Sequence, residues 1–272
     1  MLDDDALSAL AARIAAVPGV VGVALGGSRA RGEHTPESDM DLGLYYRREL
    51  DIERLGELAR EVGGADATVT ARGGWGPWVD GGGWLTIDGS AVDWIYRDLD
   101  RVERSWEDAA AGRVSFHSQA GHPAGVASFA YAGELALAVV LADPDGVLGG
   151  LRGRMADYPP ALADSLVAGL WEARFSIDIA RKGAARGDAV YVTGCLFRAV
   201  MLCAHALHGR AGRWLLNEKG AVASAGRLSI APGGFADRAH GLLGGPGTGS
   251  ADLLATLDAA ARLVDETVAA VS

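Results

Sequence analysis

Two aspartates separated by a single residue give the clearest chemical signal in the chain. Asp39 and Asp41 flank Met40, and Met40, Leu42 and Leu44 begin an alternating apolar pattern. Side chains at positions i and i+2 of a strand share one face, so the two carboxylates should project side by side. Carboxylate oxygens are the hard ligands that Mg²⁺ prefers. The pattern therefore predicts a divalent metal site at Asp39 and Asp41.

A turn that precedes the aspartates is suited to binding phosphate. Gly26-Gly27-Ser28 ends an apolar run eleven residues before Asp39. Glycines let the backbone approach a phosphate closely, and Ser28 offers a hydroxyl beside backbone amides that can form an anion-binding nest. Arg29 and Arg31 add positive charge, and the alternative is that they pair with acidic residues at the surface.

A third carboxylate is expected from a neighbouring strand. Asp93 alternates with the apolar residues of the run 92–96, which makes it a candidate metal ligand or general base, with Asp88 as the nearby rival. Glu134 stands in an apolar helical segment, where an unpaired carboxylate is costly. We expect Glu134 either to face a cleft, as a second candidate for the catalytic base, or to have a buried partner.

Hydrophobic periodicity predicts the elements that position these side chains. Residues 5–17 and 52–62 have the helical period. Five short apolar or alternating runs predict strands, at residues 20–25, 40–46, 67–71, 84–87 and 92–96. The segment 73–83 contains six glycines and two tryptophans, so we expect a mobile loop that acts as a lid or a linker.

The second half of the chain reads differently. From about residue 125 helical periods dominate, at residues 134–141, 161–182, 189–208 and 251–271, while the glycine-rich segment 226–249 has no predicted structure. These patterns predict an α+β fold. We expect residues 1–124 to form a domain with a mixed β-sheet flanked by helices, and residues 125–272 to form a helical bundle.

Composition limits the classes of partner. The 272 residues carry a formal charge of −10, which repels long nucleic acids, so none is expected as a partner. Cys195 and Cys203 fall on one predicted helix about 12 Å apart along its axis, too far for a disulfide. The chain begins with acidic residues rather than a secretory signal. We expect a cytoplasmic protein without a membrane span.

The two motifs together resemble a known signature. Gly-Gly-Ser-Arg-Ala-Arg-Gly at 26–32, followed by Ser-Asp-Met-Asp-Leu at 38–42, is similar to the signature of the DNA polymerase beta type nucleotidyltransferase superfamily. The resemblance covers residues 20–98. It implies Gly27 and Ser28 at the triphosphate, Asp39 and Asp41 on magnesium, and Asp93 as the third acidic position.

The helical second half resembles the small-molecule branch of that superfamily, which includes aminoglycoside and lincosamide nucleotidyltransferases. In that branch the helical domain completes the pocket, so the resemblance implies that residues 125–272 bind substrate. The resemblance therefore makes Tyr131, Glu134 and Asn217-Glu218-Lys219 candidates for contacting acceptor or nucleotide, with Lys219 as a nucleotide-binding residue.

The expected activity follows from the resemblance. A monomeric or homodimeric enzyme binds a nucleoside triphosphate, with ATP expected, together with two Mg²⁺ ions. It transfers the monophosphate to a hydroxyl of a small molecule, with an aminoglycoside-like antibiotic as a candidate acceptor and resistance as the corresponding role. The alternative is a partner-bound module of the toxin and antitoxin type that modifies or binds a protein. Addition of nucleotides to RNA ends ranks last, because no basic groove is evident.

Overall fold

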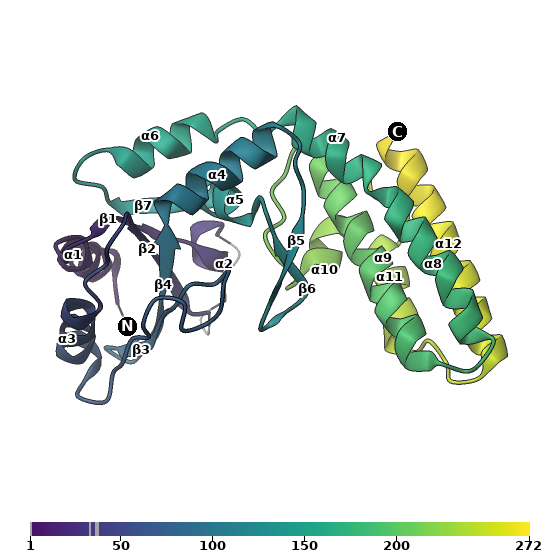
Figure 1. Cartoon of the computed structure of the whole chain (residues 1–272), viewed down its shortest axis with the longest axis horizontal. Helices are drawn as coiled ribbons and strands as arrows, with labels where there is room; N and C mark the ends of the chain where they lie inside the picture. Colours follow the sequence, from purple (N-terminus) through teal and green to yellow (C-terminus); the bar gives the residue numbers. More distant parts are fainter. Residues whose placement is uncertain (1, 33, 36–37) are drawn as a thin grey trace. The chain divides into compact units, whose positions relative to one another are not determined.

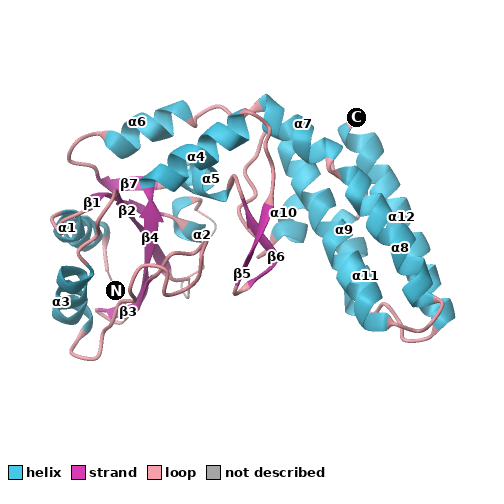
Figure 2. Cartoon of the chain, in the orientation of Figure 1, coloured by secondary structure: helices cyan, strands magenta, loops and turns pink. Residues whose placement is uncertain are grey.

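The computed structural model describes residues 2–32, 34–35 and 38–272. The chain divides into two compact units. The first comprises Met1–Asp108 and His117–Asp157, and the second comprises Ala109–Phe116 and Tyr158–Ser272. Helices and strands are distributed as in an α+β protein, with a mixed sheet in the first unit and helices in the second (Figure 2). This confirms the predicted fold class.

The first unit is organised around a five-stranded sheet. Its strands are β1 (Val20–Leu25), β2 (Met40–Tyr46), β3 (Gly82–Ile87), β4 (Ser90–Asp98) and β7 (Val139–Ala142), in the order β3-β4-β2-β1-β7. β2 and β4 are parallel, and the other neighbouring pairs are antiparallel. The sheet is therefore mixed, as predicted.

The apolar alternation of the strands determines which sheet face is buried against helices. Helices α1 (Asp4–Ala15) and α3 (Ile52–Gly63) pack on one face (Figure 1). Their buried residues form one core with Leu42 and Leu44 of β2 and Trp94 of β4. Because successive strand residues point to opposite faces, the odd-numbered residues of β2 and β4 point away from this core.

Short elements complete the first unit. They are α2 (Gly27–Ala30), α4 (Leu99–Ala110), α5 (Ala130–Leu137), α6 (Val147–Arg154) and a separate hairpin of β5 (Phe116–Gln119) and β6 (His122–Ala127). α4 follows β4 directly and ends within the second unit. α5 lies on the sheet face opposite α1 and α3, since its Glu134 contacts Arg97 of β4.

The second unit is helical. It contains α7 (Pro160–Ala168), α8 (Leu170–Ala184), α9 (Ala189–Arg210), α10 (Ala221–Gly226), α11 (Phe235–Gly244) and α12 (Ser250–Val271). α9 packs against α7, α8 and α12. α9 is long and apolar enough to cross a membrane, but 61% of its most apolar 18-residue stretch is buried, as in the core helix of a bundle. Cys195 and Cys203 are both free thiols, buried on α9.

Several sequence predictions differ from the structure. Residues 67–71 form no strand, although Thr70 N–H donates to the carbonyl of Gly82, the first residue of the edge strand β3. The predicted helix 134–141 ends at Leu137, because residues 139–142 pair with the free edge of β1. The predicted helix 161–182 is divided into α7 and α8 near Gly169.

The compact units also differ from the domain boundary predicted at residue 124. Residues 117–157 lie in the first unit. The physical reason is strand pairing, since β7 completes the sheet by hydrogen bonding to β1. The segment 226–249, which had no predicted structure, contains α11.

Candidate active site

The turn after β1 is built around the side chain of Asp41. Gly26 N–H donates to the Asp41 carbonyl, at 2.8 Å, and thereby continues the β1–β2 pairing by one residue. Gly27 has φ +62° and begins α2. A Cβ at Gly27 would collide with Oδ2 of Asp41. Glycine is therefore required at this position for two reasons. It adopts the left-handed backbone conformation without strain, and it leaves room for the carboxylate of Asp41.

Asp41 and Asp93 are brought together by strand register. The parallel pairing of β2 and β4 places Asp41 directly opposite Asp93. Neighbouring strands lie about 4.8 Å apart, and paired residues point to the same face. Both side chains are partly exposed on the face away from the core. Asp39 is exposed and lies one residue before β2 begins.

The carboxylates offer the donor chemistry that a divalent cation needs. Asp41 and Asp93 present hard oxygen ligands from adjacent strands. Within residues 2–32, 34–35 and 38–272, however, no three acidic, histidine or cysteine side chains gather as a preformed metal cluster. The two paired aspartates therefore fit one side of a cation, and the phosphate oxygens of a nucleotide could supply further ligands.

Glu134 of α5 is the next carboxylate in this region. Its Oε1 lies 3.9 Å from the position of a Cβ built on Gly26, and the Cβ of Asp41 lies equally close to that position. Arg97 donates to Oε2 through Nε at 2.8 Å, and its Nη2 lies 2.8 Å from the same oxygen. The two side chains are only 11% and 19% exposed. Glu134 therefore has the buried partner that its apolar surroundings required.

Arg97 was not predicted from the sequence. Burial by itself lowers the pKa of Arg97, but the charge of Glu134, followed by Tyr131, the hydrogen bond to Glu134 and Tyr45, raises it above its usual value. Desolvation, followed by the charge of Glu134, also raises the pKa of the buried Tyr45. The position of Arg97 in the alternation of β4, on the same face as Asp93, was the signal available in the sequence.

The predicted phosphate-binding residues are placed by the β1–α2 turn. Ser28 is the second residue of α2 and does not cap it, since the N-cap is Gly26. Arg29 donates from Nε and Nη2 to the Ser38 carbonyl, at 3.1 and 2.7 Å, and from Nε to the Asp39 carbonyl at 3.2 Å. Arg29 therefore holds the segment leading into β2. Arg31 is the C-cap of α2.

Two residues assigned to the pocket by resemblance lie in different units. Tyr131 is in α5 of the first unit, where its hydroxyl donates to the Trp78 carbonyl. Lys219 is in the second unit, in an exposed turn where its backbone N–H donates to Asn217 Oδ1. A nucleotide-binding role of Lys219 stays a prediction.

The glycine-rich segment 73–83 is held in place by hydrogen bonds and a ring contact. Gln119 accepts hydrogen bonds from Trp78 N–H and Val79 N–H through Oε1, and its Nε2 donates to the Trp75 carbonyl at 2.7 Å. The Trp78 ring stacks on His117, with centroids 3.7 Å apart. These contacts oppose the expectation of a mobile lid or linker. They come from residues far along the chain, so local sequence could not reveal them.

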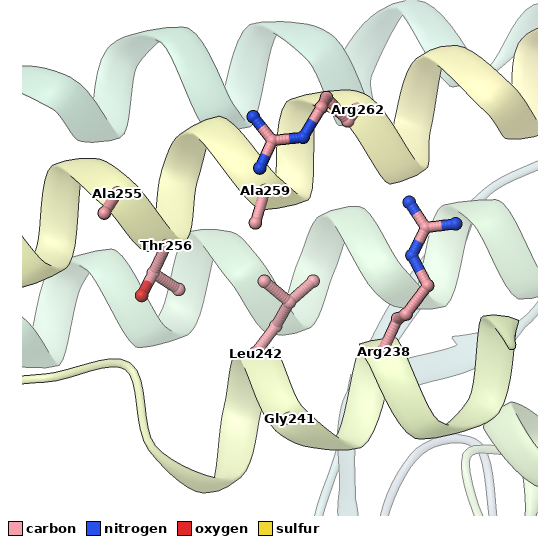
Figure 3. Close-up of a pocket in the computed structure, with 7 residues that line it drawn as sticks. All are labelled: Arg238, Gly241, Leu242, Ala255, Thr256, Ala259 and Arg262. Atoms are coloured by element: carbon pink, nitrogen blue, oxygen red, sulfur yellow. The ribbon is translucent and has the colours of Figure 1, made fainter.

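A separate groove lies between α11 and α12 of the second unit (Figure 3). It has a volume of about 460 Å³, and its lining includes Arg238, Leu242, Thr256 and Arg262. None of the predicted site residues lines it. The carboxylates and the glycine–serine turn of the first unit therefore remain the candidate active site.

The fold and the site define a class of protein. A mixed sheet that presents a glycine–serine turn beside aspartates on adjacent strands suits the binding of a nucleoside triphosphate. The model of the nucleotidyltransferase domain family matches residues 8–68, which include Gly27, Ser28, Asp39 and Asp41. Residues 8–68 are therefore similar to a nucleotidyltransferase domain, and the chain is a transferase enzyme.

Two further comparisons concern whole proteins. A solved structure of a nucleotidyltransferase-like protein from Exiguobacterium sibiricum 255-15 is similar over 96% of this chain and 74% of its own, with a TM-score of 0.46 and 12% sequence identity. No curated protein matches the chain. The match of the domain family supports the resemblance to the nucleotidyltransferase superfamily.

Proposed function

We propose that the protein transfers a nucleoside monophosphate from a nucleoside triphosphate, with ATP first among them, to a hydroxyl of a small-molecule acceptor. The observation that carries this proposal is the register of Asp41 opposite Asp93 beside the matched turn. Asp93 lies outside residues 8–68, so its position is support independent of the family match.

Each residue of the site has a role in this proposal. Gly27 and Ser28 receive the triphosphate at the start of α2, with Arg31 as a further cation. Asp41 and Asp93, with Asp39, would hold Mg²⁺, which neutralises charge on the phosphates when it is bound. We propose that Arg29 acts indirectly, by holding the backbone of Ser38 and Asp39.

The reaction needs one proton acceptor. The acceptor oxygen forms a bond to the α-phosphorus, the bond between the α-phosphorus and the bridging oxygen breaks, and pyrophosphate leaves with that electron pair. The hydroxyl proton passes to a carboxylate. Asp93 is the first candidate, because it lies directly opposite Asp41 in the pairing of β2 and β4. Glu134 is the second, and its Oε2 is already engaged by Arg97.

The experiment measures pyrophosphate release with each of the four ribonucleoside triphosphates and Mg²⁺ against a panel of aminoglycosides, lincosamides and small proteins. Asp41→Asn and Asp39→Asn should abolish release. Asp88→Asn is the matched control, since Asp88 is an exposed carboxylate in the β3–β4 turn with φ +49°, a conformation that asparagine tolerates. Equal activity of all three variants would refute the assigned site.

Charge favours a cationic acceptor. The formal charge of −10 attracts cations in general, and the paired aspartates add a local negative site. An amine-bearing antibiotic therefore fits, with resistance as its consequence. Turnover with other acceptors but with no aminoglycoside or lincosamide would reject this part of the proposal.

A second candidate function has its own observation. Trp171 and Phe175 of α8 and Val190 of α9 are large apolar side chains exposed on the helical unit. Such side chains suit a protein partner, as expected of a partner-bound module. Co-expression with the products of neighbouring genes tests this reading. A stable complex that Trp171→Lys disrupts would support it, and a lone enzyme with small-molecule turnover would count against it.

A further inference from the structure

Asp41 and Asp93 form a row of residues across β2 and β4, and this row continues into β3. β3 pairs antiparallel with β4, and Trp84 is directly opposite Asp93, which is itself opposite Asp41. Residues paired across neighbouring strands have Cβ atoms about 5 Å apart and share a face. The edge strand β3 therefore carries Trp84 on the same face as the two aspartates.

Trp84 is unusually exposed for a tryptophan in a strand. The residue is 72% exposed. One face of its ring is covered by Trp75, with ring centroids 4.6 Å apart and an interplanar angle of 18°. A stacked pair of this kind holds an indole in one orientation. The uncovered part of Trp84 is a flat apolar surface beside the aspartates.

The segment that carries Trp75 is held by several side chains. Gln119 donates to the Trp75 carbonyl, and Arg101 donates from Nη1 to the Pro77 carbonyl at 2.8 Å. A Cβ on Gly76 would collide with the Gln119 amide, and a Cβ on Gly82 would approach the Trp75 ring to 2.9 Å. The glycines of residues 73–83 thus allow the loop to pack closely behind the ring pair.

Strand order separates the two ends of this row. The sheet order β3-β4-β2-β1 puts Trp84 at one end and the turn that follows β1, with Ser28, at the other. Asp93 and Asp41 lie between them. If the triphosphate binds at Ser28, the acceptor must reach the carboxylates from another side, and the open indole lies on the β3 side.

We propose that Trp84, supported by Trp75, is the platform on which a ring of the acceptor packs, so that its hydroxyl is positioned beside Asp93. This inference rests on the proposed function. The acceptor is a small molecule that presents a sugar, alicyclic or aromatic ring face to the indole. Trp84 then determines specificity for the acceptor and contributes nothing to the binding of the nucleotide.

The test measures equilibrium binding by calorimetry. The probes are kanamycin, lincomycin and tyrosine as ring compounds, spermidine as a ringless cation, and MgATP. The proteins are the unmodified chain, Trp84→Ala, Trp84→Phe and Trp171→Ala. Trp171 is the matched control, because it is 67% exposed but belongs to the helical unit.

Because a stacking ring is lost, Trp84→Ala should bind the tightest-binding ring compound at least about tenfold more weakly than the unmodified chain does. Trp84→Phe should retain most of the affinity, and Trp171→Ala should match the unmodified chain. Binding of spermidine and MgATP should be unchanged in all variants.

Three results would overturn the proposal. They are equal binding of ring compounds by Trp84→Ala and the unmodified chain, weakened MgATP binding in Trp84→Ala, and failure of the unmodified chain to bind any ring compound. The proposed function fails separately, when the unmodified chain neither binds MgATP nor releases pyrophosphate.

Discussion

Oδ2 of Asp41 occupies the space in which Gly27 would carry a Cβ atom. The turn after β1 and the strand carboxylate are therefore fitted to each other, and any side chain at Gly27 would have to displace the carboxylate. Gly26 N–H also binds the Asp41 carbonyl, so the turn is joined to β2 through both the backbone and the side chain of Asp41. This contact links the two halves of the sequence motif.

A substitution at Gly27 should consequently damage the site more than the fold. In Gly27→Ala the new Cβ must displace the Asp41 carboxylate, and we expect loss of most pyrophosphate release. Gly32→Ala is the control, because Gly32 has φ +68° and no described atom lies within 4 Å of the position that its Cβ would take. Both variants carry a left-handed strain of about 1–2 kcal/mol. Equal activities of the two, at equal melting temperatures, would contradict this relationship.

The two candidate bases can be separated by single substitutions. Asp93→Asn should lower kcat by about 10²–10⁴-fold if Asp93 receives the hydroxyl proton. Glu134→Gln should retain more activity, because Glu134 is bound to Arg97 through Oε2. Steady-state kinetics with the best acceptor measures both values. A larger loss of kcat in Glu134→Gln, with an unchanged fold, would assign the proton to Glu134 instead.

The pair of Arg97 and Glu134 should matter strongly for stability. Removing one member of a buried ion pair leaves an unpaired charge and costs about 3–5 kcal/mol. We therefore expect Arg97→Met to reduce the free energy of unfolding by this amount, and Glu134→Gln in the same chain to recover part of it. Urea unfolding of the unmodified chain, Arg97→Met and the double variant measures both changes in the free energy of unfolding.

An exposed ion pair provides the control for the effect of breaking the buried pair. Arg238 contacts Glu266 through two hydrogen bonds, but the side chains are 35% and 48% exposed. Exposed pairs contribute little to stability, because water screens their charges. If Arg238→Met destabilises the protein as much as Arg97→Met, burial of the Arg97 pair is not the cause of its effect.

Local alternation was sufficient to predict part of the site. The strand 40–46 was predicted with the bounds observed, because Met40, Leu42 and Leu44 alternate with polar or small residues. The same reasoning put Asp93 on the face opposite Trp94, and parallel register places it beside Asp41. Strand order itself was not predictable, since it depends on which distant segments pair.

The missed features depend on contacts between distant parts of the chain. The sequence predicted β7 as the end of a helix, although residues 139–141 are apolar and two of them are β-branched. These residues form a strand because they pair with the open edge of β1, which local sequence does not reveal. Trp84 was included in a predicted strand, but its exposure and its stacking on Trp75 follow from the position of β3 at the sheet edge.

The loop 73–83 offers a direct test of long-range support. Gln119→Ala removes three hydrogen bonds to the loop backbone, at Trp75, Trp78 and Val79. Hydrogen exchange of residues 73–81 should become faster, because the unsupported loop opens more often. Exchange in α12 of the helical unit serves as the internal reference. Unchanged exchange in the loop would show that Gln119 does not hold it.

The helical unit should lose stability as the pH falls, because of a buried histidine on α9. Desolvation, with smaller contributions from His208 and Arg198, lowers the pKa of His205 to about 3. The unfolded chain takes up a proton near pH 6.5, while folded His205 stays neutral, so its contribution is complete above pH 6.5 and is lost between pH 6.5 and about 3. From about pH 7.5 to 5.5 the loss amounts to about 1.4 kcal/mol.

The variant His205→Leu should remove this part of the pH dependence, whatever its effect on absolute stability. Phe116 contacts the His205 ring edge to face, with centroids 5.2 Å apart, so the site already has an apolar neighbour for leucine. Urea unfolding at the two pH values gives the difference for each protein. His240→Gln is the control, because His240 is exposed on α11. The same pH dependence in His205→Leu as in the unmodified chain would exclude His205 as its source.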